Sequence, residues 1–225
     1  MNLEKVERAL IFAAHPDDEM LGAGGTIARL SKQGTKVTVV VFSLEDTGYS
    51  TAGMEKNVLE VRKKEARQAA GILGVHESVV LETVPQGDIS IYRECIRLIR
   101  KCRPQIIFTH FRDDRNRDHR AVSEITDESC WKANQNVLSE LGKPWHTSQL
   151  YCYELSNLFT NPSDIVDITA TIESKIKAVK TQTSQFALLP GMADYLRSLA
   201  KVRGYMIDAD YGEAFLLSPL MPSKH

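Results

Sequence analysis

The sequence predicts an α/β fold: a Rossmann-like three-layer α/β/α sandwich with a mostly parallel sheet. Apolar runs of strand length alternate along the chain with segments of helical periodicity, and the connections between them are short. Continuous β-branched runs such as residues 37–42 are typical of strands covered on both faces. This alternation favours strands joined by crossover helices. We expect a single domain, residues 1–225, because no linker, repeat or low-complexity tract divides the chain.

The first strand–helix–strand unit lies near the amino terminus. Residues 9–14 form an apolar run that predicts a buried strand, and apolar residues then recur at helical spacing over 20–33. Gly34 is expected to end this helix. Residues 37–42 supply the second strand, and a polar loop follows it at 43–48.

Helices and strands continue to alternate beyond this unit. The expected elements are a helix at 58–73 closed by Gly74, a strand at 79–81, a helix at 90–101, a strand at 105–109, a helix at 121–134, a strand at 149–154 and a helix at 168–181. Apolar residues with intervening Arg and Lys make the first of these helices amphipathic. The faces of the helices after Ala121 are available for packing within the subunit or against a second copy in a homo-oligomer.

Composition and charge exclude several classes of partner. A formal net charge of -1 gives no broad basic field, which argues against nucleic acid or an anionic membrane. No run is long enough to span a membrane, and the amino terminus lacks a signal-peptide pattern. The four cysteines lack Cys-x-x-Cys spacing, which favours reduced thiols in a cytoplasmic protein. A small molecule is the expected ligand.

The segment His15-Pro16-Asp17-Asp18-Glu19 bears most directly on function. It follows the first predicted strand, and ligands of open α/β sheets bind beyond the carboxyl ends of parallel strands. A hydrolytic zinc takes three protein ligands from His, Asp or Glu and leaves one position for water. His15 and Asp18 are close enough in sequence to share an ion. His119, which follows another predicted strand, is the expected third ligand.

Two further carboxylates are expected to support the chemistry. Asp17 would lie beside the ion and accept a proton from the attacking water. Asp118 would hold a ligand in place or relay a proton. The alternative is that the acidic cluster only caps the next helix, because carboxylates accept hydrogen bonds from the free N–H groups at a helix start. The Asp118-His119 pair favours the metal site over this alternative.

The glycines at residues 22–25 invite comparison with a dinucleotide-binding loop. Such a loop begins directly after the strand and closes with Gly or Ala. Here the acidic segment intervenes, and Ile27 stands at the last position. We therefore expect these glycines to allow close packing of the helix against a loop.

Three segments together resemble the LmbE-like/PIG-L family of zinc-dependent N-deacetylases. They are residues 14–19, residues 62–66 with 73–74, and residues 118–122. The resemblance implies hydrolysis of the acetamide of an N-acetylglucosamine-type amino sugar or its conjugate. It also implies His15, Asp18 and His119 as metal ligands and Asp17 as general base. Zn²⁺ is the implied cofactor, and Fe²⁺ or another divalent ion accepts the same ligands.

The chain departs from the family pattern at Asn116. Many members carry His-Pro-Asp-His, in which the first His assists the oxyanion and the leaving group, and Asn116 stands at the place of that His. An amide donates a hydrogen bond but does not transfer a proton near neutral pH. The proton must then come from Asp17 or from another residue. Our candidate is His110 at the end of its strand, with a plain strand-edge cap as the alternative.

Arg62 and Glu45 are the candidate substrate-binding residues. The guanidinium of Arg62 suits a phosphate or sugar oxygen, although an Arg on an amphipathic helix is more often a solvated or salt-bridged surface residue. Its match to the Arg-x-x-Glu of the family favours binding. Glu45, after the second strand, would touch sugar hydroxyls or lie in a solvated turn.

Two functions follow from these observations. The first is a metal-dependent amidohydrolase acting on a small-molecule N-acetylated amino sugar or glycoconjugate. The second, motivated by Asn116, is a metal-containing sugar-binding protein with little or no turnover.

Overall fold

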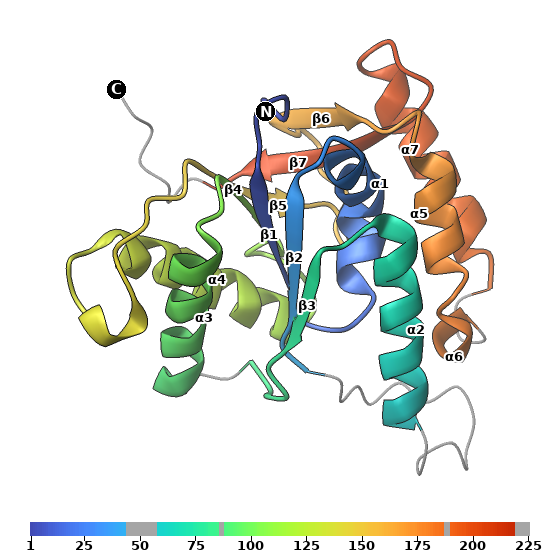
Figure 1. The fold of residues 1–225 in the computed structure, drawn as a ribbon. Coiled ribbons are helices and arrows are strands. Elements are labelled where there is room, and N and C mark those ends of the chain that lie inside the picture. Colours follow the sequence, from blue (N-terminus) through green and yellow to red (C-terminus); the bar gives the residue numbers. More distant parts are fainter. Residues whose placement is uncertain (44–57, 86–87, 187–189, 219–225) are drawn as a thin grey trace.

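The computed structural model describes residues 1–43, 58–85, 88–186 and 190–218. Over these residues, seven strands form one sheet in the order β3-β2-β1-β4-β5-β7-β6. Helices cover both faces of the sheet (Figure 1). The arrangement confirms the predicted α/β sandwich with a mostly parallel sheet. In the described part of the chain, no helix has the length and apolar character that a membrane span requires.

The parallel part of the sheet contains the strands expected from the apolar runs. These are β1 (Arg8–Ala13), β2 (Lys36–Val41), β3 (Glu77–Val80), β4 (Ile106–Thr109) and β5 (Gln149–Tyr153). The crossover helices are α1 (Asp18–Lys32), α2 (Val58–Leu73), α3 (Ile89–Cys102) and α4 (Arg117–Asn134). Strand β1 pairs with β2 on one side and with β4 on the other, so the strand order reverses there. The carboxyl ends of β1 and β4 therefore open the crevice where ligands bind in such sheets.

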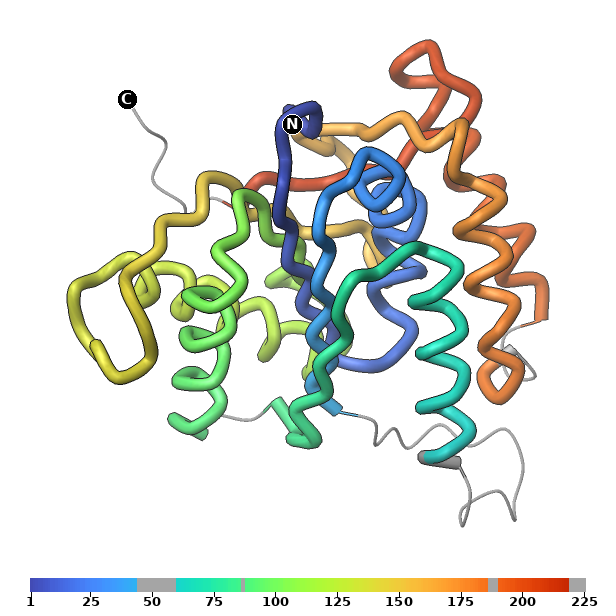
Figure 2. The backbone as a smooth tube through the Cα atoms, in the orientation of Figure 1, coloured from blue at the N-terminus to red at the C-terminus, as the bar shows by residue number. Residues whose placement is uncertain are grey.

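The last part of the chain closes the sheet with antiparallel pairs. Its elements are the short helix η1 (Ser139–Leu141), β6 (Asp164–Asp167), α5 (Ile172–Val179), α6 (Thr183–Phe186), α7 (Met192–Tyr205) and β7 (Gly212–Leu217). Strand β7 runs antiparallel to both β5 and β6. The amino group of Met1 pairs with Asp164, which places the amino terminus beside β6 (Figure 2). We did not expect β6, β7, α6 or α7 from the sequence.

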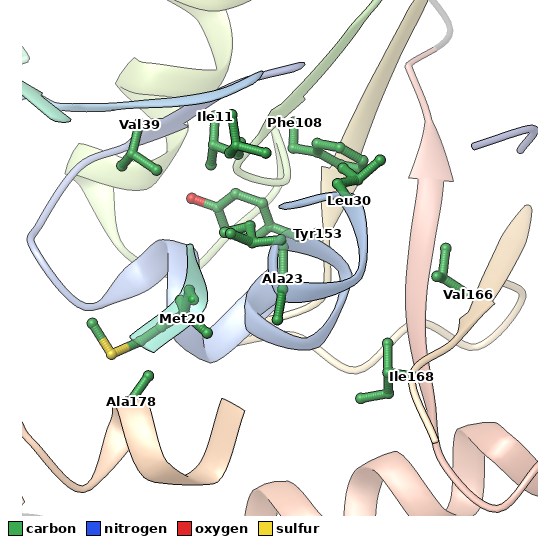
Figure 3. Packing of buried hydrophobic residues seen from close by; sticks show 14 of the residues in the cluster. Ile11, Met20, Ala23, Leu30, Val39, Phe108, Tyr153, Val166, Ile168 and Ala178 are labelled. Atoms are coloured by element: carbon green, nitrogen blue, oxygen red, sulfur yellow. The ribbon is translucent and has the colours of Figure 1, made fainter. Parts of the chain in front are cut away.

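Two hydrophobic clusters lie on opposite faces of the sheet. Helices α1, α2, α5 and α7 lie on one face, and α3 and α4 on the other (Figure 1). Along β1, Ile11 faces the first group, whereas Leu10 and Phe12 face the second. The Tyr153 ring lies between Ile11 and Ala23 of α1 (Figure 3). Burial on both faces explains why the central strands read as continuous apolar runs.

Both helices that border the strand reversal begin earlier than the sequence suggested. Helix α1 begins at Asp18 instead of residue 20, and α4 begins at Arg117 instead of residue 121. Polar residues interrupt the apolar pattern at both starts. Carboxylates are nevertheless favourable in the first turn of a helix, where they face the partial positive charge of its amino end. The expected ligands Asp18 and His119 are consequently held on first helical turns.

Helix α1 bends at Ala23, whose φ of -136° and ψ of 15° are not helical. The bend frees backbone N–H groups that a straight helix would satisfy. Gly25 N donates to Glu213 Oε1 at 2.8 Å, and Thr26 N donates to Glu213 Oε2 at 2.7 Å. Glu213 of β7 is thus a substitute cap inside the helix.

The glycines of α1 allow close packing, as we expected. A Cβ atom on Gly22 would lie 2.3 Å from Cδ2 of Tyr153, and one on Gly25 would lie 2.7 Å from Cδ1 of Ile168. Neither distance is tolerated by real side chains. Small residues at these positions bring α1 against the end of β5 and against the loop after β6.

Candidate metal centre and active site

Three side chains with metal-binding atoms meet at the carboxyl ends of β1 and β4. One ligand atom each from His15, Asp18 and His119 lies within 4.8 Å of the other two. The residues are 8%, 4% and 5% exposed. His15 follows β1, Asp18 opens α1, and His119 lies in the first turn of α4. The strand reversal therefore brings together residues about a hundred positions apart.

Asp18 lies at the centre of this cluster. Its Oδ2 atom is 3.3 Å from His15 Nδ1, and its Oδ1 atom is 3.4 Å from His119 Nε2. The backbone N–H of His15 also donates to Oδ2 at 2.8 Å. Burial opposes the charge on Asp18, but the imidazoles of His110, His119 and His15 hold the pKa of its carboxyl well below the ordinary value. Asp18 is ionised at neutral pH.

Asp114 supports His119 from behind. Its Oδ1 atom lies 3.3 Å from His119 Nδ1, and the side chain is buried. The N–H of Asn116 donates to the same oxygen at 2.8 Å, which fixes the carboxylate. Burial lowers the pKa of His119, but Asp114 and Asp18 together raise it to about 10. The local charges therefore favour a cation, either a proton on the imidazole or a metal ion in its place.

Our sequence analysis assigned no role to Asp114. Asp114 lies in a turn before α4, where its backbone N–H donates to Phe111 O at 3.2 Å. This turn brings the carboxylate to His119. A usable signal was nonetheless present: imidazole ligands commonly face a carboxylate with their second nitrogen. An acidic residue a few positions before a ligand histidine, in the same strand-end loop, is a candidate for that partner.

The donor set fits a divalent cation. Two imidazoles and one carboxylate are the usual protein ligands of a catalytic zinc, which keeps its fourth position for water. His15, Asp18 and His119 all line a cavity of about 380 Å³, so a ligand entering this space would meet them directly. The same donors also suit Fe²⁺ and other divalent ions.

Asp17 lines the same cavity as the three buried donors. It is the residue before the first turn of α1, yet within the described part of the chain its side chain makes no capping hydrogen bond to that helix. Asp18 also bonds backward, to the N–H of His15. The cap alternative for the acidic cluster thus accounts for neither side chain.

Asn116 caps α4 and also lines the cavity. Its Oδ1 atom accepts a hydrogen bond from the N–H of Asp118 at 2.8 Å, so the amide nitrogen is the group left to donate elsewhere. The carboxylate of Asp118 faces one of the three donors: Oδ2 lies 3.5 Å from His15 Nε2. Arg117 lies on its other side, with Nε 3.7 Å from Oδ1.

His110 lies behind Asp18, fully buried. Its ring stacks on that of His119 with centroids 4.0 Å apart. Its Nε2 atom accepts a hydrogen bond from Ala14 N at 2.9 Å and lies 2.9 Å from Tyr153 Oη and 3.2 Å from Asp18 Oδ2. Burial lowers the pKa of His110 although Asp18 opposes this. His110 is not among the described residues that line the cavity.

The two candidate substrate-binding residues have different outcomes. Arg62 on α2 is 1% exposed, so it is not the solvated residue of the alternative, and it offers almost no surface to a ligand. Its neighbour in the Arg-x-x-Glu pattern, Glu65, accepts hydrogen bonds from Thr183 Oγ1, Ser184 N and Ser184 Oγ at 2.7, 2.9 and 2.6 Å. Glu45 lies outside the described residues.

Solved structures share this fold over nearly the whole chain. N,N'-diacetylchitobiose deacetylase from Pyrococcus horikoshii, complexed with an inhibitor, superposes with a TM-score of 0.85 at 26% identity, covering 97% of this chain and 86% of that one. GalB, the 4-carboxy-2-hydroxymuconate hydratase from Pseudomonas putida KT2440, also gives 0.85, at 22% identity and with 97% and 99% covered. The second likeness concerns the fold alone, because one fold hosts different reactions.

Sequence comparison relates the chain to deacetylases. Diacetylchitobiose deacetylase from Thermococcus kodakarensis is 26% identical over 231 residues, which cover 95% of this chain and 84% of that protein. The family model described as PIG-L, GlcNAc-PI de-N-acetylase, matches residues 10–130, a segment that contains His15, Asp18 and His119. This match covers just over half of the chain and confirms the resemblance drawn from the sequence: the chain belongs to the PIG-L family.

Proposed function

We propose that this protein is a metal-dependent N-deacetylase that hydrolyses the acetamide of an N-acetylglucosamine-type amino sugar or its conjugate. The observation that carries the proposal is the buried cluster of His15, Asp18 and His119, which faces a cavity that Asp17 also lines. Family membership and the deacetylase relatives support the same reaction. They do not favour the alternative of a sugar-binding protein without turnover.

We propose zinc, or a similar divalent ion, as the cofactor. His15 and His119 would hold it through imidazole nitrogens and Asp18 through its carboxylate. When bound, such an ion supplies Lewis acidity that makes water easier to deprotonate and polarises the acetyl carbonyl.

Asp17 is the proposed general base. Its carboxylate lies in the cavity beside the three donors and would accept a proton as water attacks the acetyl carbon. The same carboxyl would then return this proton to the nitrogen of the departing amine. Asp17 thereby takes part in both proton-transfer steps. We assign both steps to it because the amide of Asn116 transfers no proton.

Asn116 is the proposed hydrogen-bond donor to the acetyl oxygen. Its Oδ1 atom is held by Asp118 N, so the orientation of the amide is fixed before substrate arrives. The amide nitrogen then stabilises the negative charge that develops on the acetyl oxygen during attack. Preorganised donors of this kind contribute about a hundredfold to a thousandfold in rate.

The remaining polar residues are proposed to position the ligands. Asp114 holds His119 at Nδ1, and Asp118 faces His15 Nε2. We also propose a positioning role for His110 in place of the proton-donating role expected from the sequence. A fully buried ring that receives the N–H of Ala14 on Nε2 has no route to a substrate.

The proposal is tested by acetate release from a panel of N-acetylglucosamine conjugates, using protein loaded with zinc or ferrous iron. Asp17→Asn should retain one ion per chain and release no acetate, because only the proton acceptor is lost. His119→Ala should lose the ion itself, as measured by metal analysis after gel filtration. Equal metal loss in both variants, or unchanged acetate release by Asp17→Asn, would contradict the assignment of these roles.

A further inference from the structure

The residues that line the cavity at the candidate metal site fall into two chemical groups. The polar group contains the three donors, Asp17 and Asn116, and also Arg115, Glu154, Ser156 and Gln185. The apolar group consists of Leu21, Leu155, Met192, Tyr195, Leu196 and Leu199, and the last four of these belong to α7. The reacting acetamide belongs beside the ion ligands and Asp17. The rest of the substrate then extends into the remainder of the cavity, where α7 supplies most of the apolar lining.

Helix α7 lines the cavity with one face. Met192, Tyr195, Leu196 and Leu199 stand at positions i, i+3, i+4 and i+7, the spacing of a single helical stripe. Leu196 is buried, whereas Tyr195 is 45% exposed although it lines the cavity. The stripe thus presents an aromatic residue that the protein covers only in part.

The position of α7 is fixed by a buried ion pair. Arg203, near the end of the helix, donates from Nε to Glu154 Oε2 at 3.0 Å, and its Nη2 atom contacts the other carboxylate oxygen. Arg203 Nη2 also donates to Phe159 O at 2.7 Å. Glu154 follows β5 and itself lines the cavity. The apolar stripe of α7 is therefore anchored to the end of β5, next to the candidate metal site.

We propose that Tyr195 and Leu199 form a subsite for an apolar, preferably aromatic, group attached to the N-acetylated amino sugar. This inference rests on the proposed deacetylase function and names the part of the substrate that the function leaves open. The α7 stripe offers a sugar hydroxyl only the phenol of Tyr195 as a hydrogen-bond partner, whereas the other polar lining residues, Arg115, Glu154, Ser156 and Gln185, come from other segments. An aryl group stacked on that ring buries apolar area on both partners.

The test compares the methyl and phenyl β-glycosides of N-acetylglucosamine. Wild-type protein should deacetylate the phenyl glycoside with a kcat/KM about tenfold higher, as expected for one aromatic contact. Tyr195→Ala should remove this preference and leave the methyl glycoside within about twofold of wild type. Tyr205→Ala is the matched control, because Tyr205 lies on the same helix, is 85% exposed and is not among the described cavity residues.

Two results would overturn the subsite. One is a wild-type protein that does not distinguish the glycosides, and the other is an equal loss on both glycosides in Tyr195→Ala, which would mean that the ring contacts the sugar itself. Calorimetric binding of both glycosides to zinc-loaded Asp17→Asn separates this inference from the deacetylase proposal. Selective binding of the phenyl glycoside without acetate release from wild type would retain the subsite and refute the deacetylase, whereas non-selective binding would refute the subsite.

Discussion

Glu213 holds the bent helix α1 to the sheet, and its removal tests how the fold supports the site. The side chain is buried, and its two oxygens accept the N–H groups of Gly25 and Thr26 that the bend leaves free. Lys175 of α5 pairs with the same carboxylate, with Nζ 2.6 Å from Oε1, and is itself only 4% exposed. One carboxylate therefore satisfies three buried donors.

Glu213→Ala should lower the free energy of unfolding by about 5 kcal/mol. Removing one partner of a buried ion pair costs about 3–5 kcal/mol, because the other charge stays buried without compensation. Each unpaired buried N–H adds about 1 kcal/mol, less whatever water enters the space. The loss is large against the total of about 5–15 kcal/mol for a folded domain. Adding Lys175→Met to Glu213→Ala should recover about half of it, since the uncompensated charge is then gone.

Urea denaturation followed by circular dichroism measures this loss as a shift in midpoint at constant slope. The matched control is Glu173→Ala, which removes a carboxylate from an exposed pair with Arg197, where Nη1 lies 2.6 Å from Oε1. This variant should be close to wild type, because water replaces the lost partner. Equal stability of Glu213→Ala and Glu173→Ala would refute the reasoning.

Three further predictions concern packing, metal affinity and thiols. Gly22→Ala should lower the free energy of unfolding in urea by about 1–3 kcal/mol, because its Cβ would meet the Tyr153 ring. The control Gly71→Ala on α2, with open space around it, should be neutral or slightly stabilising. Equal effects of the two substitutions would contradict the packing. Asp114→Asn should weaken zinc binding about tenfold to a hundredfold in competition with a chelator, and unchanged affinity would exclude its support of His119. Burial raises the pKa of Cys152 to about 12 and also raises the pKa values of the Cys95 and Cys130 thiols. These three thiols should therefore react with Ellman's reagent at pH 8 only after unfolding. Rapid reaction of all three in the folded protein would count against their burial.

The part of the fold that the sequence predicts is the part dominated by continuous burial. Strands β1, β2 and β4 are buried on both faces, so their apolar runs are unambiguous. Strand β6 is only four residues long and largely half-buried, and β7 is held by pairing with β5 and β6 from distant parts of the chain. No local pattern announces such pairings, and the closing antiparallel strands were missed for that reason.

The candidate site likewise has residues that the sequence predicts and residues that it does not. The cluster of His15, Asp18 and His119 follows from two strand-end motifs, because parallel strands deliver their carboxyl ends to one edge. Asp114 contacts His119 across a turn. The α7 stripe lines the same cavity as His15, although it lies far along the chain from that residue. His110 shows the limit most clearly, since a strand-end position alone does not say whether a side chain turns toward the cavity or into the core.

The position of Asn116 before the first turn of α4 explains why Asn suits the place where many family members carry His. A residue before the first helical turn gains stability by accepting a hydrogen bond from the helix, and Asn is among the best residues for this. Asn116 does so with Oδ1 and thereby keeps His119 on the following turn, facing Asp18. An imidazole at this position would gain proton-transfer ability but would make a poorer cap. In this proposal Asp17 transfers the protons, whereas Asn116 caps the helix and donates one hydrogen bond. The Asp17→Asn experiment tests this separation of roles directly.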